Sequence, residues 1–216
     1  MIKRAHGLVL RTRPFTETSL IVQWLTAEFG RISTIAKGAR RPKSPFRGKL
    51  DLFYLVEFSF VRSRRSDLHT LSEVELRSTH AGLRCDLRLL QQASYCAALV
   101  EQTTERDTPL PAVFELMEGF VAALLALPPQ PQTIFAFELK LLEELGLRPD
   151  IATARLTAGA KEILRALTHA NWPAVSRLKL SAAQTTELRQ FLHGFLIFHL
   201  GRIPPARNRA LATEIP

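Results

Sequence analysis

The first third of the chain alternates apolar and polar residues with a period of two, the pattern of half-buried β-strands. We predict strands over residues 7–13, 18–26, 31–38, 50–62 and 68–76. The longest of them gathers large apolar side chains on one face: Leu52, Tyr54, Val56, Phe58 and Phe60. Five short strands with Gly- and Pro-marked turns favour a small β-barrel. Five is the strand count of an OB-fold, and an SH3-like barrel would give a similar pattern.

The rest of the chain has the apolar spacing of amphipathic helices. We predict helices over residues 82–106, 110–127, 133–146, 159–170 and 181–200, with WPAVSRLKL (172–180) as a link between the last two. Gly146 suits a helix C-terminus, and Pro149 just beyond it cannot continue the helix. The change of period predicts a domain boundary near residues 78–82. We therefore expect an α+β chain, with an OB-fold over residues 1–80 and an all-α domain over residues 81–216.

The positive charge of the chain is concentrated in the predicted barrel. The net charge is +9, and residues 1–80 hold 15 Lys and Arg against 7 Asp and Glu, a balance of +8. Residues 81–216 hold 14 against 13, a balance of +1. Residues 31–49 alone contain seven basic side chains and no acidic one, between two predicted strands. Such a block is presented on a fixed surface, which suits the phosphate backbone of a nucleic acid.

Within this block, Gly38 and Gly48 bracket the segment ARRPKSPFR. Pro42 and Pro45 prevent a regular strand or helix there, so we expect a stiffened loop that projects from the barrel. Phe46 lies inside the basic loop and is the best candidate for stacking on a base.

Two further basic groups belong to the same predicted surface, one on the first strand and one in the turn before the last strand. We expect all of these groups to line one groove. A charged loop that only interacts with water is the alternative. The candidate DNA-binding residues are Arg11, Arg13, Lys37, Arg40, Arg41, Lys43, Phe46, Arg47, Lys49, Arg62, Arg64 and Arg65. Among the other aromatic residues, Phe15 is a weaker candidate for stacking, whereas Trp24 and Tyr54 are expected in the core.

The sequence offers no catalytic motif. It contains no Gly-rich phosphate loop, no nucleophile elbow and no zinc-protease motif, and its six histidines are scattered. We therefore expect no enzymatic activity, no cofactor and no metal. No apolar run has the length of a membrane span, and the N-terminus lacks the features of a signal peptide. Cys85 and Cys96 lie about 16 Å apart along one predicted helix, so we expect buried free thiols and a reducing cytoplasm.

Several segments resemble the RecO family of bacterial DNA repair proteins. In the first third, the resemblance rests on Glu17 to Val22, on LTAEFG (25–30), on AKGARRPKS (36–44) and on Gly48-Lys49-Leu50. Two helical segments, FELKLLEELGLRPDI (137–151) and FLIFHLGRIPPARNRAL (195–211), are similar to later landmarks of that family. The resemblance therefore spans most of the chain.

The resemblance implies an OB-fold joined to a helical domain, in a non-enzymatic recombination mediator associated with the nucleoid in the cytoplasm. Such proteins bind single- and double-stranded DNA, anneal complementary strands and, with RecR, help to load RecA onto strands coated by single-strand DNA-binding protein. The acidic, hydrophobic tail of that coating protein would need an apolar pocket with a nearby cation, for which Arg84, Arg88 and Arg106 are candidates. An OB-type RNA-binding or ribosome-associated factor is the alternative. A metal-dependent nuclease is least favoured, because the basic region holds few carboxylates.

One feature departs from the family pattern. Many members carry a cysteine cluster that resembles a zinc module, after the segment that matches LGLRPDI. Here the corresponding stretch is ATARLTAGAKEILRAL, which contains neither cysteine nor histidine. Four thiolate or imidazole ligands cannot be assembled there, so we expect ordinary packing instead of a structural zinc.

Overall fold

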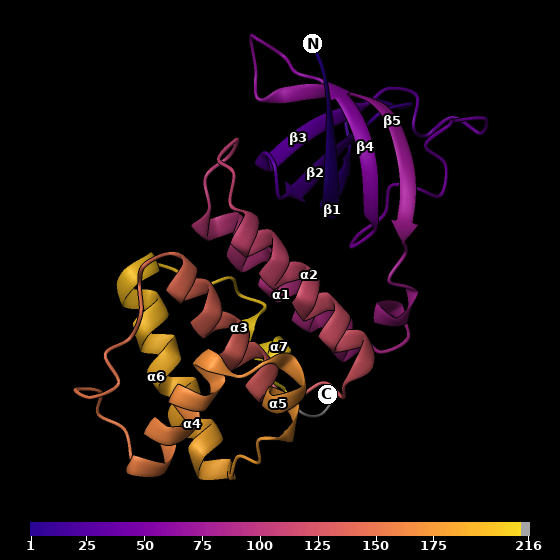
Figure 1. The fold of residues 1–216 in the computed structure, drawn as a ribbon. Helices are drawn as coiled ribbons and strands as arrows, with labels where there is room; N and C mark the ends of the chain where they lie inside the picture. The colour runs from indigo at the N-terminus through magenta and orange to yellow at the C-terminus, as the bar shows by residue number, and fades with distance from the viewer. Residues whose placement is uncertain (213–216) are drawn as a thin grey trace. The chain divides into compact units, whose positions relative to one another are not determined.

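A computed structural model describes residues 1–212, which divide into two units (Figure 1). The first unit consists of Met1–Ala81 together with Thr104–Glu115. The second consists of Gly82–Thr103 together with the chain from Leu116 onward. The chain therefore leaves the first unit, returns to it for twelve residues, and leaves it again. No helix among residues 1–212 is long and apolar enough to cross a membrane.

The first unit is a closed barrel of five strands in the order β1-β2-β3-β5-β4. All neighbouring strands are antiparallel except β3 and β5, which run parallel. The parallel pairing that closes the barrel is short, because it joins only Ser33–Ile35 of β3 to Leu68–Thr70 of β5. The prediction of a five-stranded OB-fold is confirmed. The strands are β1 (Ile2–Pro14), β2 (Leu20–Thr26), β3 (Gly30–Ala36), β4 (Leu55–Val61) and β5 (Leu68–Ser78).

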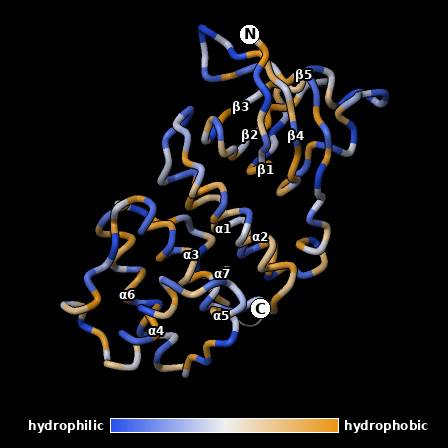
Figure 2. The backbone as a smooth tube through the Cα atoms, viewed as in Figure 1, coloured by the Kyte–Doolittle hydropathy of each residue, from blue (hydrophilic) through white to orange (hydrophobic). Residues whose placement is uncertain are grey.

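The inward faces of the strands form the barrel core, as the period-two pattern requires. Trp24 is fully buried and stacks on Phe58, with ring centroids 4.2 Å apart and an interplanar angle of 17°. Its indole Nε1 donates to Thr34 Oγ1 at 2.8 Å, so the buried N–H has a partner. In Figure 2 the barrel strands carry apolar residues, whereas the tips of the β3–β4 and β4–β5 connections are hydrophilic.

Two strands differ in extent from the sequence prediction. β1 begins at Ile2 because its first half pairs with β4 while its second half pairs with β2. β4 begins at Leu55, so Leu52 lies in a turn before the strand. Phe53 ends this turn with a φ of +62°, a left-handed conformation that cannot continue a strand, and its ring is buried.

The second unit is helical, and α3 is its central element. Residues 132–139 are buried on every side of α3, which packs against α1, α4, α5 and α6. A short 3-10 helix, η1 (Ala81–Arg84), precedes the first α-helix. The helices are α1 (Leu87–Thr103), α2 (Pro111–Ala126), α3 (Pro131–Glu144), α4 (Ala158–His169), α5 (Trp172–Arg177), α6 (Ala182–Leu200) and α7 (Arg207–Ala210).

The helix ends follow from local sequence. Gly146 has a φ of +72° just after α3. The Gly146 N–H donates to Glu143 O, and the Leu147 N–H donates to Leu142 O. This pair of bonds is a Schellman motif, as the glycine predicted. Ser181 opens α6 with a capping box, because its side chain accepts from Gln184 N–H while the Gln184 side chain accepts from Ser181 N–H.

Two sequence predictions about the helical part were wrong. The segment 172–180 is not only a link, because it contains α5, which Asn171 caps by accepting from Ala174 N–H at 2.9 Å. The cysteines also differ from each other: both are free thiols, but Cys96 is buried on α1 whereas Cys85 is exposed before that helix begins. The exposed position follows from the break between η1 and α1.

A buried ion pair ties the C-terminal helix to the centre of the second unit. The Arg207 guanidinium on α7 donates to both Glu138 oxygens, at 2.7 and 2.9 Å, and both side chains are almost fully buried. Tyr95 on α1 donates its hydroxyl hydrogen to Glu138 Oε1 at 2.5 Å. Burial and the neighbouring Glu138 carboxylate raise the pKa of Tyr95 well above its usual value, which keeps this donor protonated.

Candidate nucleic-acid interface

The basic loop, residues 37–49, leaves β3 as a series of tight turns. Backbone N–H groups donate from Arg41 to Gly38 O, from Ser44 to Arg41 O and from Arg47 to Ser44 O, at 3.0–3.2 Å. Gly38 adopts a φ of +69° that the first turn requires. The loop is therefore ordered by its own hydrogen bonds, as the prolines predicted. Its exposed cations are Lys37, Arg40, Arg41, Lys43 and Arg47.

Phe46 anchors the basic loop in the barrel and does not project from it. The side chain is only 6% exposed and belongs to the barrel core, with Ala39 and Leu50 packed alongside. A ring in this position has no face free for a base, so the proposed surface no longer includes Phe46. The apolar ring is held in the core because the loop turns back over the barrel, which a local sequence pattern does not reveal.

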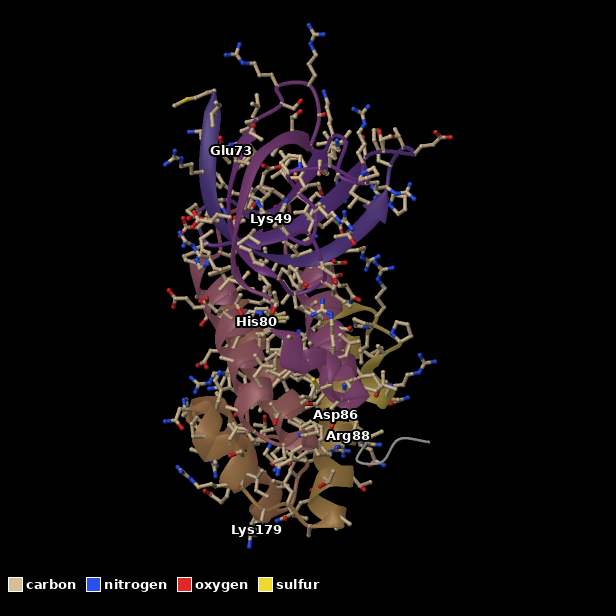
Figure 3. The ribbon with its side chains drawn as sticks, turned by 90° about the vertical axis from the view of Figure 1, so that its right-hand side faces the viewer. Lys49, Glu73, His80, Asp86, Arg88 and Lys179 are labelled. Carbon is tan, nitrogen blue, oxygen red and sulfur yellow. The ribbon has the colours of Figure 1, made fainter. Side chains whose placement is uncertain are left out.

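Lys49 is also placed differently from the other cations of the loop. Its ammonium donates to Val74 O on β5 at 3.2 Å, and the residue is half-buried against the barrel (Figure 3). It closes the loop onto β5 and offers less of its charge to solvent than Arg41 or Lys43.

Arg40 connects the basic loop to the turn between β1 and β2. Its N–H donates to Thr18 O at 2.9 Å, and its Nη1 donates to Thr16 O at 3.1 Å. The turn follows directly on Arg11 and Arg13, which are both exposed near the end of β1. It also carries Phe15, whose side chain is 52% exposed. Phe15 is thus the aromatic residue beside these cations that has a ring available for stacking.

The basic turn, residues 62–65 between β4 and β5, forms a second group of cations. Arg62, Arg64 and Arg65 are exposed, and Arg62 Nη2 lies 3.2 Å from Asp107 Oδ1. Asp107 N–H in turn donates to Arg31 O at 3.0 Å, so the basic turn lies beside the start of β3. The basic loop lies at the end of β3. At about 3.3 Å per residue, the two groups are roughly 20 Å apart along the strand.

The structure therefore does not gather all of the predicted cations into one groove. Figure 1 shows the basic loop and the basic turn projecting from different parts of the barrel. Between them runs the outer face of β2 and β3, whose sequences LIVQWLT and GRISTIA contain no carboxylate. In OB-folds, this face and the β1–β2 and β4–β5 loops are the usual ligand-binding surface.

An acidic hollow occupies another face of the barrel, where β1, β4 and β5 lie side by side. It has a volume of about 470 Å³. Arg77 hydrogen-bonds to Glu57 and holds the pKa of that carboxyl below its usual value, so the carboxylate stays charged near neutral pH. A phosphate backbone would be repelled here. The charged side chains that line the hollow are Arg4, Glu28, Glu57, Glu73 and Glu75.

Among residues 1–212, no group of three or more His, Cys, Asp and Glu side chains is arranged to hold a metal ion.

The three arginines predicted to contact an acidic tail lie in different surroundings. Arg88, in the second unit, is paired with Asp86, because its Nη2 lies 2.7 Å from Asp86 Oδ2 and its Nε contacts both carboxylate oxygens (Figure 3). Arg84 and Arg106 are exposed, and Arg106 belongs to the first unit and not to the first helix.

A groove of about 370 Å³ lies along α6 in the second unit. Its floor includes Phe191, Phe195 and the exposed Gly194, and its rim includes Arg155. The groove thus combines an apolar floor with a cation that the sequence did not single out. Glu187, also on the rim, accepts hydrogen bonds from Thr157 N and Oγ1 at 2.6 and 2.8 Å.

A closed five-stranded barrel with cations around its β2–β3 face, followed by a helical unit, defines an OB-fold protein with an appended helical domain. Comparison with known families gives the particular assignment. Residues 1–80 match the family "Recombination protein O N terminal", and residues 84–153 match "Recombination protein O C terminal". The chain belongs to the RecO family of DNA repair proteins, and its role is in DNA repair and recombination.

Individual relatives agree with this assignment. The chain is 31% identical to "DNA repair protein RecO" of Anaeromyxobacter dehalogenans strain 2CP-C in an alignment 236 positions long, which covers 94% of this chain and 93% of that protein. It is 34% identical to the protein of the same name from Rhodopirellula baltica, over 78% of this chain and 62% of that one. For Bacillus subtilis strain 168, the identity is 34% over 70% of this chain and 58% of the relative.

Proposed function

We propose that this protein is a non-enzymatic recombination mediator that binds single- and double-stranded DNA across the β2–β3 face of its barrel. The observation that carries the proposal is the placement of ordered, exposed cations at both ends of β3, next to a face without carboxylates. A strand laid along this face would meet the basic loop at one end and the basic turn at the other. Phe15 would stack on a base beside the loop.

Binding of this kind makes annealing a natural consequence. Cations that neutralise two phosphate backbones reduce the repulsion between complementary strands, whatever their sequence. The acidic hollow would keep bound DNA off the β1–β4–β5 face by like-charge repulsion. In the cell, the protein would act on the nucleoid with RecR to load RecA onto strands coated by single-strand DNA-binding protein.

The first test replaces three exposed cations of the basic loop, in the variant Lys37→Ala/Arg41→Ala/Lys43→Ala. Each lost contact to single-stranded DNA lowers the salt slope by about 0.7, so the slope should fall by about 2. At 0.1 M salt this corresponds to a loss of up to about 100-fold in affinity. Fluorescence anisotropy with an oligonucleotide measures both quantities.

The matched control removes three exposed cations from the second unit, in the variant Arg177→Ala/Lys179→Ala/Arg202→Ala. It changes the net charge equally and should leave the slope within error of the unaltered protein. Equal effects of the two variants would mean that total charge, and not the basic loop, determines binding. Tighter binding to structured RNA than to single-stranded DNA would favour the RNA-binding alternative.

We infer that the α6 groove receives the acidic, hydrophobic tail of single-strand DNA-binding protein. Apolar residues of the tail would contact Phe191 and Phe195 while its carboxylates approach Arg155. Annealing of strands coated by that protein should depend on its tail, and Arg155→Ala should reduce annealing of coated strands without changing that of naked strands. The control Arg165→Ala removes an exposed arginine of α4. Equal annealing by Arg155→Ala and the control on coated strands would place the tail elsewhere.

A further inference from the structure

The segment Thr104–Glu115, which we call the strap, belongs to the barrel unit although α1 of the second unit precedes it and the chain returns to that unit at Leu116, within α2. Arg31 on β3 holds its beginning, because the Arg31 guanidinium donates to Thr104 Oγ1 at 2.7 Å and to Thr104 O. The Asp107 N–H donates to Arg31 O at 3.0 Å. The Phe114 ring packs edge-on against the His6 ring, with ring centroids 5.6 Å apart. The strap is thus tied to the barrel at both of its ends.

Gly30 shows how closely the strap approaches. A Cβ atom placed on Gly30 would lie 1.8 Å from Thr108 O, and the φ of this glycine is +62°. Only a residue without a side chain fits in this conformation under the strap. The contact is therefore built into the first residue of β3.

Asp107 joins the strap to the basic turn. Its Oδ1 lies 3.2 Å from Arg62 Nη2 and 3.4 Å from His69 Nε2. His69 is 3% exposed and stacks on Phe60, while its Nδ1 accepts from Ser63 N–H at 3.4 Å. Because Nδ1 is an acceptor, Nε2 carries the hydrogen and donates to Asp107. One carboxylate therefore organises a buried histidine and an exposed arginine of the proposed DNA surface.

We propose that the Asp107 carboxylate competes with DNA phosphate for Arg62. The ion pair between Arg62 and Asp107, which we call the latch, would then break when DNA binds. The inference rests on the proposed function. The Arg62 side chain is 49% exposed, and an ion pair this open to solvent is weak enough to be exchanged. A phosphate offers the guanidinium the same charge-assisted geometry as a carboxylate. His69 would keep its own bond to Asp107 when Arg62 turns to DNA.

The latch also gives DNA a connection to the rest of the chain. Since the strap follows directly on α1 and its last residues form the start of α2, loosening it changes the ends of both helices. DNA binding at the basic turn should therefore raise hydrogen exchange at the strap, first at the Asp107 amide that is bonded to Arg31 O.

The test is Asp107→Asn, which removes the charge while its side-chain oxygen can still accept from His69. Asparagine also tolerates the left-handed φ of +54° at this position. Freeing Arg62 for one more phosphate should raise the salt slope for single-stranded DNA by about 0.7 and tighten binding about fivefold at 0.1 M salt. The control Glu105→Gln makes the same charge change on the strap and should alter binding less than about twofold, because a carboxylate without a partner cation is screened.

A double-mutant cycle with Arg62→Ala isolates the contact. Asp107→Asn should have no effect in the Arg62→Ala background, and strap exchange should rise with DNA only when Arg62 is present. Unchanged or weaker binding by Asp107→Asn would overturn the latch, as would equal tightening by Glu105→Gln or tightening that persists without Arg62. A failure of the unaltered protein to bind DNA would instead overturn the proposed function itself.

Discussion

Substitutions at Phe46 test whether the aromatic ring of the basic loop stacks on DNA at the surface or anchors the loop in the barrel core. As a surface ring, it would stack on a base and contribute about 1–3 kcal/mol to binding. As the structure has it, the ring is 6% exposed in the barrel core and fixes the loop from inside. The two views predict opposite results for stability and for DNA affinity.

Replacement of a buried phenylalanine by alanine costs about 3–5 kcal/mol, from lost transfer free energy and the cavity left behind. We expect Phe46→Ala to lower the free energy of unfolding of the barrel by that amount. Phe46→Leu nearly conserves volume and should cost about 1 kcal/mol. Because leucine cannot stack yet can still fill the core, Phe46→Leu should leave DNA affinity unchanged.

The assay is urea unfolding followed by the fluorescence of Trp24, which is buried beside Phe58 in the barrel. The chain has two tryptophans, so a Trp172→Phe background makes the signal specific to this unit. Phe15→Leu is the matched comparison: the side chain is 52% exposed, so stability should hardly change while affinity falls about 5- to 100-fold. If Phe46→Leu weakens DNA binding as much as Phe15→Leu does, the anchoring role is refuted.

Two further predictions concern the packing of each unit. Arg207→Ala leaves the Glu138 carboxylate buried without its ion-pair partner and should cost about 3–5 kcal/mol in urea unfolding followed at Trp172. The double variant Arg207→Met/Glu138→Gln removes both charges, keeps an acceptor for the Tyr95 hydroxyl and should recover most of the loss. Gly30→Ala should push the strap off β3, which limited proteolysis would detect as new cleavage within residues 104–110; an unchanged digestion pattern would contradict the close contact.

Much of the barrel could be predicted from the sequence, because a strand buried on one side alternates apolar and polar residues with a period of two. The face of β4 with Val56, Phe58 and Phe60 and the burial of Trp24 were predicted for that reason. Leu52 was misplaced because the same alternation continued into a turn, where the left-handed Phe53 ends it. The short helix α5 was missed because six residues are too few to show a period of 3.6.

The candidate nucleic-acid interface was harder to predict from the sequence, because its important features depend on residues far apart in the chain. The sequence predicted an exposed, basic loop over residues 37–49, and the structure has such a loop, but the burial of Phe46 and the hydrogen bond from Lys49 to Val74 O depend on how the loop folds back. The pairing of Arg62 with Asp107 joins positions 45 residues apart, across the whole of α1. Only the return of the chain to the barrel creates it, and no local pattern signals such a return.

Hydrogen bonds close the connection where the family resemblance would place a cysteine cluster. Between α3 and α4, the Asp150 carboxylate accepts from Ala152 N–H at 3.0 Å and from Thr153 Oγ1 at 2.9 Å. Thr157 caps α4 and is held to α6 by two bonds to Glu187. Glu187 of α6 therefore holds the start of α4 through two hydrogen bonds. Because Glu187 and Arg155 both line the α6 groove, the contacts that hold the connection also shape the proposed site for the acidic tail.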